Sequence, residues 1–346
     1  MTKILKVGLI GYGFAGKTFH APFIVNNANM ELAKVASSDA AKVHADYPDV
    51  QVVATPEAIF ADPAIDLVVI PTPNDTHFPL ARMALAAGKH VVVDKPFTVT
   101  LSQAQALQQQ AQQSGLLLSV FHNRRWDSDF LTLKALLNEG ALGEVVYFES
   151  HFDRYRPQVR QRWREQGGVG SGIWYDLGPH LLDQALQLFG KPDRLFVDLG
   201  ELRPGAQAVD YFHALLSYGN RRVVLHASML AAAESPRYVV HGTRGSYIKY
   251  GLDPQEDRLK AGERLPQADW GYDMRDGVVT LSRGDLLAEQ PLLNIPGNYP
   301  AYYAAVRDAI AGTGENPVPA ADAIAVMALI ELGLESARLQ QALPVA

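Results

Sequence analysis

The sequence predicts an α/β protein of two domains: a doubly wound parallel sheet, then an α+β domain with an open, mostly antiparallel mixed sheet. In the first third of the chain, apolar runs of four or five residues alternate with helical stretches, as in parallel strands buried on both faces. Farther along, strand-like runs follow one another through short turns, which favours hairpins. At 346 residues, the chain also exceeds the length at which one core usually divides.

The first domain is predicted to span residues 1–121 and to have the Rossmann arrangement of strands and helices. Its expected strands are Val7–Ile10, Leu32–Ala36, Asp66–Ile70, His90–Val93 and Leu116–Val120. Its expected helices are Phe14–Val25, Asn74–Ala87 and Ser102–Gln113.

The second domain is predicted to span residues 122–346, with its last helices able to pack back on the first. Its expected strands are Val145–Tyr155, Leu195–Leu199, Tyr211–Tyr218, Arg222–Leu230, Tyr238–His241 and Tyr247–Tyr250. Its expected helices are one before Gly143, then Leu177–Leu188, Ala301–Ile310 and Ala320–Gln340. An open sheet usually needs its exposed face covered, so we expect a homodimer or homotetramer.

The composition of the chain excludes several classes of function. The chain has no cysteine, which excludes disulfides, thiolate zinc sites, iron–sulfur clusters and cysteine nucleophiles, and we expect no metal. A net charge of -6 gives no support for a nucleic-acid partner. No apolar run approaches the roughly 20 residues that span a bilayer. The N-terminus lacks a signal-peptide pattern, so we expect a cytoplasmic protein.

One stretch is locally basic. Five arginines lie between Arg154 and Arg164, and they indicate either a solvated loop or a site for an anionic or phosphorylated ligand.

The strongest motif is the glycine turn Gly11-Tyr12-Gly13-Phe14-Ala15-Gly16, between a predicted strand and a predicted helix. In a dinucleotide site, the first glycine permits the tight turn and the second lets the backbone approach the pyrophosphate. The third lets helix and strand pack closely, and the helix N-terminus attracts the phosphates. The turn therefore predicts a bound NAD or NADP.

The end of the second strand bears on the choice of cofactor. An NAD enzyme usually has Asp or Glu there for the ribose hydroxyls, whereas this chain has Ser37 and Ser38, with Lys42 one helical turn beyond. Those groups suit a 2′-phosphate. Asp39 would repel a phosphate unless it caps the next helix, which would turn it away. We predict NADP, with NAD as the alternative.

Three further motifs occur along the chain: Pro71-Thr72-Pro73-Asn74-Asp75-Thr76-His77, Asp94-Lys95-Pro96, and Gly170-Ser171-Gly172-Ile173-Trp174-Tyr175-Asp176-Leu177-Gly178-Pro179-His180. With the glycine turn, they resemble the glucose–fructose oxidoreductase / inositol dehydrogenase / MocA family over nearly the whole chain. The resemblance is greatest to the branch that contains NADP-dependent scyllo-inositol dehydrogenases and an uncharacterised enterobacterial oxidoreductase.

The resemblance implies a nucleotide-binding domain followed by an open mixed sheet that serves substrate binding, with the active site between them. It makes Lys95 a catalytic and substrate-orienting residue, with Asp176 and His180 as its partners and His180 as the proton acceptor. It also implies a cis bond before Pro96. The chain departs from the family in two places: the usual Glu-Lys-Pro begins with Asp94, which puts its cofactor contact in doubt, and the usual Gly-Gly pair is Gly170-Ser171-Gly172.

The chemistry of these residue types agrees with alcohol oxidation. The cofactor takes a hydride, a base such as histidine takes the hydroxyl proton, and an ammonium stabilises the developing alkoxide. Asp176 and His180 share a face if their segment is one helix. Structural alternatives remain: Asp176 as an N-cap, Lys95 as a loop lysine and His180 as a structural histidine.

Other candidates flank the predicted crevice. For the cofactor they are Thr72, Pro73, Asn74, His77, Asp94 and Asn123, although Asn74 is also a plausible N-cap and His77 a plausible structural residue. For the substrate they are Arg124, Tyr155 and Trp163, the last because an apolar ring face suits a sugar or cyclitol. His151, Asp153 and Tyr155 share one face of a regular strand, where they either bind hydroxyls or are solvated.

The favoured function is reversible hydride transfer between NADP and a secondary alcohol of a polyol, cyclitol or sugar. Two alternatives stay open. Some relatives of the family hydrolyse glycosides with tightly held NAD, and such an enzyme would retain NAD on purification without net NADPH production. A catalytically silent dinucleotide sensor would be expected to lack Lys95 or His180, and both are present.

Overall fold

The computed structural model describes residues 3–263, 265 and 269–346. The chain forms two compact units, and it enters each of them three times. The first unit comprises Met1–Trp126, Gln255–Trp270 and Asn298–Ala325. The second unit comprises Asp127–Pro254, Gly271–Gly297 and Val326–Ala346.

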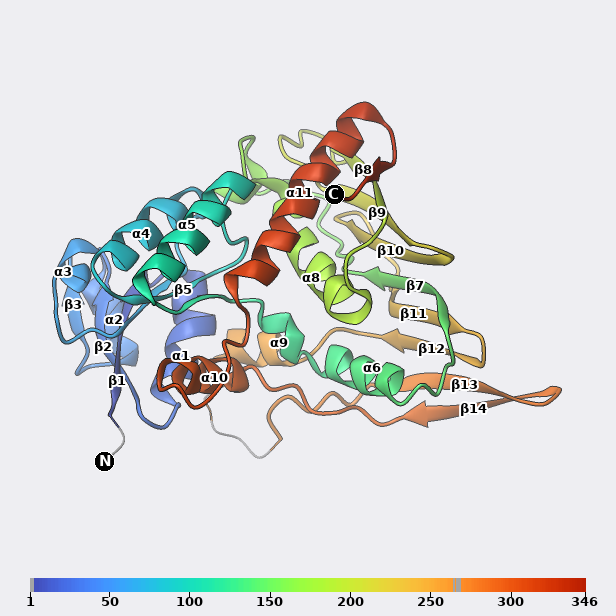
Figure 1. Ribbon diagram of the computed structural model, residues 1–346, viewed down its shortest axis with the longest axis horizontal. Helices are drawn as coiled ribbons and strands as arrows, with labels where there is room; N and C mark the ends of the chain where they lie inside the picture. Colours follow the sequence, from blue (N-terminus) through green and yellow to red (C-terminus); the bar gives the residue numbers. More distant parts are fainter. Residues whose placement is uncertain (1–2, 264, 266–268) are drawn as a thin grey trace. The chain divides into compact units, whose positions relative to one another are not determined.

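A six-stranded parallel sheet forms the centre of the first unit, in the order β3-β2-β1-β4-β5-β6 (Figure 1). Its strands are β1 Leu5–Ile10, β2 Met30–Ala36, β3 Gln51–Val53, β4 Leu67–Ile70, β5 His90–Val93 and β6 Leu118–Val120. Successive residues such as Val68 and Val69 are both fully buried, because helices cover both faces. The predicted doubly wound sheet is confirmed, whereas β3 was not expected.

Helices of the first unit are α1 Ala21–Val25, α2 Ala40–Asp46, α3 Glu57–Phe60, α4 Asn74–Ala86, α5 Leu101–Ser114, α9 Gln255–Lys260, α10 Pro300–Ile310 and the start of α11 Ala320–Leu339. Local signals set their ends: the Thr100 side chain caps α5 at its start, and Gly115 stops it with a φ of 64°. The helix expected at Phe14–Val25 contains a π-helical turn, Gly16–His20, directly before α1.

A nine-stranded sheet forms the second unit, in the order β14-β13-β12-β11-β7-β10-β9-β8-β15. Its strands are β7 Val145–His151, β8 Arg194–Gly200, β9 Tyr211–Tyr218, β10 Arg221–Ser228, β11 Pro236–Gly242, β12 Gly245–Tyr250, β13 Gly277–Arg283, β14 Leu286–Leu292 and β15 Leu343–Pro344. Only the β7–β10 pair is parallel among the strands of this sheet that the structure describes, so the predicted mixed sheet is confirmed. β7 ends four residues before the predicted limit at Tyr155.

One face of this sheet is buried and the other is open. Along β9, Phe212, Ala214 and Leu216 are fully buried, while the alternating His213 and Leu215 are only half-buried. The helices of this unit are α6 Ser128–Asn138, α7 Gly172–Asp176, α8 Gly178–Phe189 and the rest of α11.

The buried Trp174 joins two of those helices. Its indole N–H donates to the Ile330 carbonyl on α11, and its ring leaves room only for glycine at Gly178 and Gly333. None of the helices in the described part of the chain combines the length and hydropathy needed to cross a membrane.

Candidate active site

The residues predicted to bind the cofactor follow neighbouring parallel strands of the first unit. The glycine turn follows β1, Ser37 and Ser38 follow β2, Thr72 follows β4, and Lys95 follows β5. Since parallel strands end at the same edge of a sheet, these segments meet there, at the point where the strand order reverses between β1 and β4.

The glycine turn has the geometry that a pyrophosphate requires. Gly11 has a φ of 97°, which side chains rarely adopt. A Cβ on Gly16 would lie 2.2 Å from the Gly11 carbonyl oxygen, so the third glycine is needed for close packing. A Cβ on Gly13 would meet nothing within 4 Å. The second glycine therefore leaves open space beside the backbone, and the turn fits a dinucleotide.

A pocket of about 430 Å³ lies against this turn. It is lined by Ile10, Gly11, Tyr12, Gly13, Ala36, Ser37, Ser38, Asp39, Lys42, Ala54, Pro56 and Thr72. The Asp39 carboxylate accepts a hydrogen bond from the Lys42 backbone N–H at 3.0 Å, so of the two roles considered for Asp39 the capping of α2 is the one observed. The Ser37 hydroxyl accepts from the Asp39 backbone N–H at 3.1 Å and steadies the same loop.

The two aromatic residues of the turn are placed differently. Tyr12 is buried, and its hydroxyl donates to the Asp46 carboxylate at 2.8 Å. Burial and this carboxylate raise the pKa of Tyr12, which keeps its hydroxyl a donor. Phe14 is 56% exposed and touches the Phe19 ring edge-on.

Asp94 is held by groups of its own unit. One carboxylate oxygen accepts from the Lys95 backbone N–H at 2.7 Å, and the other lies 3.5 Å from Nε2 of His20. Nδ1 of the fully buried His20 lies 2.6 Å from the Tyr303 hydroxyl. Burial would raise the pKa of Asp94, but His20, with the charges of Lys95 and His77, outweighs it, and the pKa is lowered. The carboxylate thus stays ionised and fixes the backbone that presents Lys95.

His20 and Tyr303 were missed by the sequence-based prediction. Their only signal was the position of His20 one helical turn after Gly16. The Lys95–Pro96 peptide is cis, as the resemblance implied.

His77 joins two of the predicted motifs. It is fully buried, with Nδ1 at 2.9 Å from the Pro96 carbonyl oxygen and Nε2 at 2.9 Å from the Thr72 carbonyl oxygen. Asn74 is buried one position inside α4, and Pro73 holds the N-cap position, so the capping alternative for Asn74 is wrong. The contact of either residue with a cofactor stays a prediction.

In the second unit, Asp176 and His180 flank a break between two helices. Asp176 is the last residue of α7, Leu177 separates the helices, and His180 lies buried in the first turn of α8. The spacing of one continuous helix therefore does not apply to them, and Asp176 does not hold the N-cap position of α8. Gly172 has a φ of 78° and lies against the Val209 backbone, which requires glycine at this place in the motif.

Arg164 is the nearest cation to Asp176 among the ion pairs of the described residues, with Nε at 3.8 Å from a carboxylate oxygen. Its guanidinium also lies 4.7 Å from the centre of the Trp163 ring, and that ring is 37% exposed. Glu165 anchors the loop through ion pairs with Arg162 at 2.7 Å and Arg203 at 3.0 Å. Two arginines of the basic run, Arg162 and Arg164, therefore form ion pairs within the protein, and Arg164 is a site candidate that the prediction left unassigned.

The remaining residues predicted to bind cofactor or substrate lie on separate segments of the chain. Asn123 and Arg124 are buried in the short helix after β6, and Arg124 pairs with Glu256. Tyr155 is 60% exposed and forms an isolated bridge with Leu230. Their roles stay predictions.

Comparison with known proteins decides the family. Residues 5–122 match the model of an oxidoreductase family with an NAD-binding Rossmann fold, and residues 134–346 match its C-terminal alpha/beta domain. The chain belongs to the Gfo/Idh/MocA oxidoreductase family.

This Gfo/Idh/MocA protein has full-length relatives. It is 71% identical over 98% of both chains to the uncharacterized oxidoreductase YdgJ of Escherichia coli. It is 40% identical, over 96% of this chain and 94% of the relative, to the scyllo-inositol 2-dehydrogenase (NADP(+)) IolW of Bacillus subtilis. Its fold matches that of the YPO2259 oxidoreductase from Yersinia pestis with a TM-score of 0.97 and 72% identity, over 100% and 98% of the two chains. The chain is therefore an NAD(P)-dependent oxidoreductase with dehydrogenase relatives.

Proposed function

We propose that this protein catalyses the NADP-dependent, reversible oxidation of a secondary alcohol on a polyol, cyclitol or sugar. One observation carries the proposal: Lys95 follows β5 at the same sheet edge as the glycine turn. A cation in that position suits an alcohol bound beside a nicotinamide. The relative named as an NADP(+)-dependent scyllo-inositol dehydrogenase supports the substrate class.

The glycine turn and the Ser37–Lys42 segment would hold the dinucleotide, whose nicotinamide takes up or returns the hydride. The Lys95 ammonium orients the substrate hydroxyl and stabilises the charge that develops on its oxygen. The His180 imidazole accepts the hydroxyl proton, and the Asp176 carboxylate stabilises the resulting imidazolium. The Arg164 guanidinium, 3.8 Å from an Asp176 carboxylate oxygen, balances the charge of that carboxylate.

The pocket residues that follow β2 support a preference for NADP over NAD. Asp39, the acidic residue there, is engaged as the cap of α2. No ion pair of the exposed Lys42 ammonium is found within the part of the chain that the structure describes. Ser38 and Lys42 therefore offer a hydroxyl and a cation to a 2′-phosphate.

Lys42→Ala is expected to lower kcat/KM for NADP by about tenfold or more, since a charge-assisted phosphate contact is lost, and to leave kcat/KM for NAD unchanged. Lys191→Ala, at an exposed lysine in the turn after α8, is the matched control. Steady-state kinetics with both cofactors measures the effect. A wild-type preference for NAD, or an equal loss with both cofactors, would contradict the assignment.

The function itself is tested by following NADP reduction over inositols, pentoses, hexoses and their phosphates. We expect turnover with a subset that shares one hydroxyl configuration. Retained NAD after purification together with glycoside cleavage, and without net NADPH formation, would identify the hydrolase alternative instead. Binding of NADPH without turnover of any alcohol would indicate the sensor.

We also propose that the chain assembles into a homodimer or homotetramer through the open face of the nine-stranded sheet. Half-buried aromatic and aliphatic side chains such as Tyr211 and Leu215 on this face support self-association. Light scattering coupled to gel filtration measures the mass, and a monomer at micromolar concentration would contradict the proposal.

A further inference from the structure

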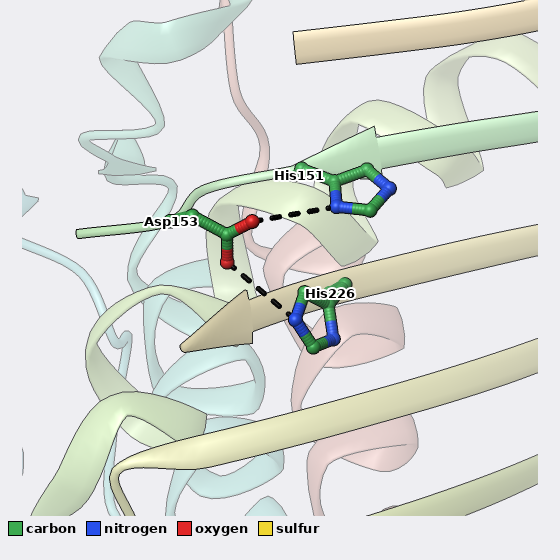
Figure 2. Close-up of side chains that lie close together, drawn as sticks. All are labelled: His151, Asp153 and His226. Atoms are coloured by element: carbon green, nitrogen blue, oxygen red, sulfur yellow. Dashed lines mark ion pairs between the residues drawn. The ribbon is translucent and has the colours of Figure 1, made fainter. Parts of the chain in front are cut away.

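A group of three side chains lies together on the second unit, from two strands that are distant in sequence. His151 ends β7, and His226 is its register partner on the parallel strand β10. Asp153 follows two residues after His151. Figure 2 shows the Asp153 carboxylate between the two imidazole rings, with one oxygen directed at each. The distances are 3.5 Å from Asp153 to Nδ1 of His151 and 3.5 Å from Asp153 to Nε2 of His226.

These spacings differ from those of hydrogen bonds. An N–H···O bond rarely exceeds about 3.2 Å. Ligand atoms around a tetrahedral zinc, each about 2.1 Å from the metal, are about 3.4 Å apart. All three ligand atoms lie within 4.8 Å of one another, so a side-chain movement of about 1 Å would complete the triangle around a cation.

The hydrogen bonding of His151 also favours a cation. Its Nε2 lies 2.9 Å from a carboxylate oxygen of Glu149, which can only accept. In the tautomer with its proton on Nε2, Nδ1 of His151 is the nitrogen that can bind an ion beside the Asp153 carboxylate. Nδ1 is buried and has no hydrogen-bond partner in the described structure. A carboxylate on the remote nitrogen is how metal-binding histidines are oriented.

The group is held in place by the sheet. The Ser228 backbone N–H donates to the Asp153 carboxylate at 2.9 Å, so its position does not depend on a flexible loop. The side chains of His151 and His226 are each 18% exposed and that of Asp153 is 9% exposed. In the single chain they are shielded enough to strengthen a metal bond and still reach solvent, and association through this open face would enclose the ion, because His226 contacts the Tyr211 ring.

We propose that His151, Asp153 and His226 bind one divalent cation of the zinc type. Two imidazole nitrogens and one carboxylate oxygen suit zinc and its neighbours in the transition series, whereas magnesium and calcium prefer oxygen ligands alone. The prediction that the chain binds no metal rested on the absence of cysteine, and this ligand set needs none. The bound ion links β7 to β10 and leaves a fourth position for water.

The native protein, stripped with a chelator and gel-filtered, is titrated with Zn²⁺ by calorimetry, and the retained metal is quantified by mass spectrometry. We expect about one zinc per chain and no uptake of Mg²⁺. At a hundredfold excess over the Kd, zinc should raise Tm by about 5 °C. His226→Gln and Asp153→Asn should each abolish both effects. His241→Gln is the matched control, because His241 lies in the same sheet on β11 and contacts Ser246 instead.

A measurement on the wild-type protein keeps the proposal testable if the variants fold poorly. Co²⁺ should give the strong visible absorption of a four-coordinate site, and Zn²⁺ should protect His151 and His226, but not His241, from acylation by diethylpyrocarbonate. Failure of the wild-type protein to retain zinc, zinc uptake by a folded His226→Gln variant at the wild-type level, or equal acylation of all three histidines overturns the proposal. These readouts do not depend on dehydrogenase activity.

Discussion

Lys95→Met should abolish turnover while leaving the dinucleotide bound. Methionine has nearly the volume of lysine but no charge, so the half-buried position stays filled while the developing alkoxide loses its stabilising cation. Loss of one such electrostatic group typically lowers kcat by about a hundredfold to a thousandfold, and a residue that also orients the substrate loses more. We expect a fall in kcat of at least about a thousandfold.

Three readouts separate this role from a structural one. The Kd for NADPH, measured by fluorescence, should stay within about threefold of wild type, which is about 0.7 kcal/mol. Tm should not fall, and Lys191→Met should behave as wild type throughout. Lys95→Arg keeps the charge but changes its shape, so partial activity would identify charge as the larger contribution. Near-wild-type turnover by Lys95→Met would remove Lys95 from the active site.

Gly16→Ala and Gly13→Ala should both weaken cofactor binding, but for different reasons. A Cβ on Gly16 would lie 2.2 Å from the Gly11 carbonyl oxygen, and that backbone cannot yield without opening the turn. Such overpacking costs about 1–3 kcal/mol, so we expect Gly16→Ala to lower Tm as well as NADPH affinity. A Cβ on Gly13 meets nothing within 4 Å. Gly13→Ala should therefore fold with an unchanged Tm and lose NADPH affinity by at least about tenfold, because its methyl group occupies space meant for the pyrophosphate.

The contrast between the two variants is the test. Calorimetry gives Tm for each, and fluorescence titration gives the NADPH affinity. Wild-type affinity in Gly13→Ala would show that the pyrophosphate does not approach this turn. An unchanged Tm in Gly16→Ala would show that the turn has more room than its geometry indicates.

Sequence alone determined the parallel sheet and its dinucleotide turn. Strands buried on both faces must be continuously apolar, so β1, β4 and β5 stand out as short runs of Val, Ile and Leu. The glycine turn could also be recognised from the sequence, because the spacing of its glycines follows from local backbone geometry. Asp39 as the cap of α2 was likewise predictable, since a cap involves only the next few residues.

Strands without that pattern were missed. β14 is mostly exposed, and β13 alternates between buried and exposed residues only over its first three positions, so neither strand has the sustained alternation that reveals a hairpin. β3 has only three residues, one exposed and two half-buried, which is too few for a pattern. The helix expected from Leu177 corresponds to α8, whereas α7 was missed because its five residues are too few for a helical pattern.

Contacts between distant residues were decided only by the tertiary structure. Tyr303 behind His20 and Asp94, and His226 beside His151 and Asp153, are each brought in from far along the chain. The approach of His226 to His151 depends on the register of β10 against β7, and a one-residue slip would turn one ring to the other face of the sheet. The spacing of residues along the sequence does not reveal the register of β10 against β7. The sequence therefore predicted where a dinucleotide binds, and the packing of strands determined which other side chains meet.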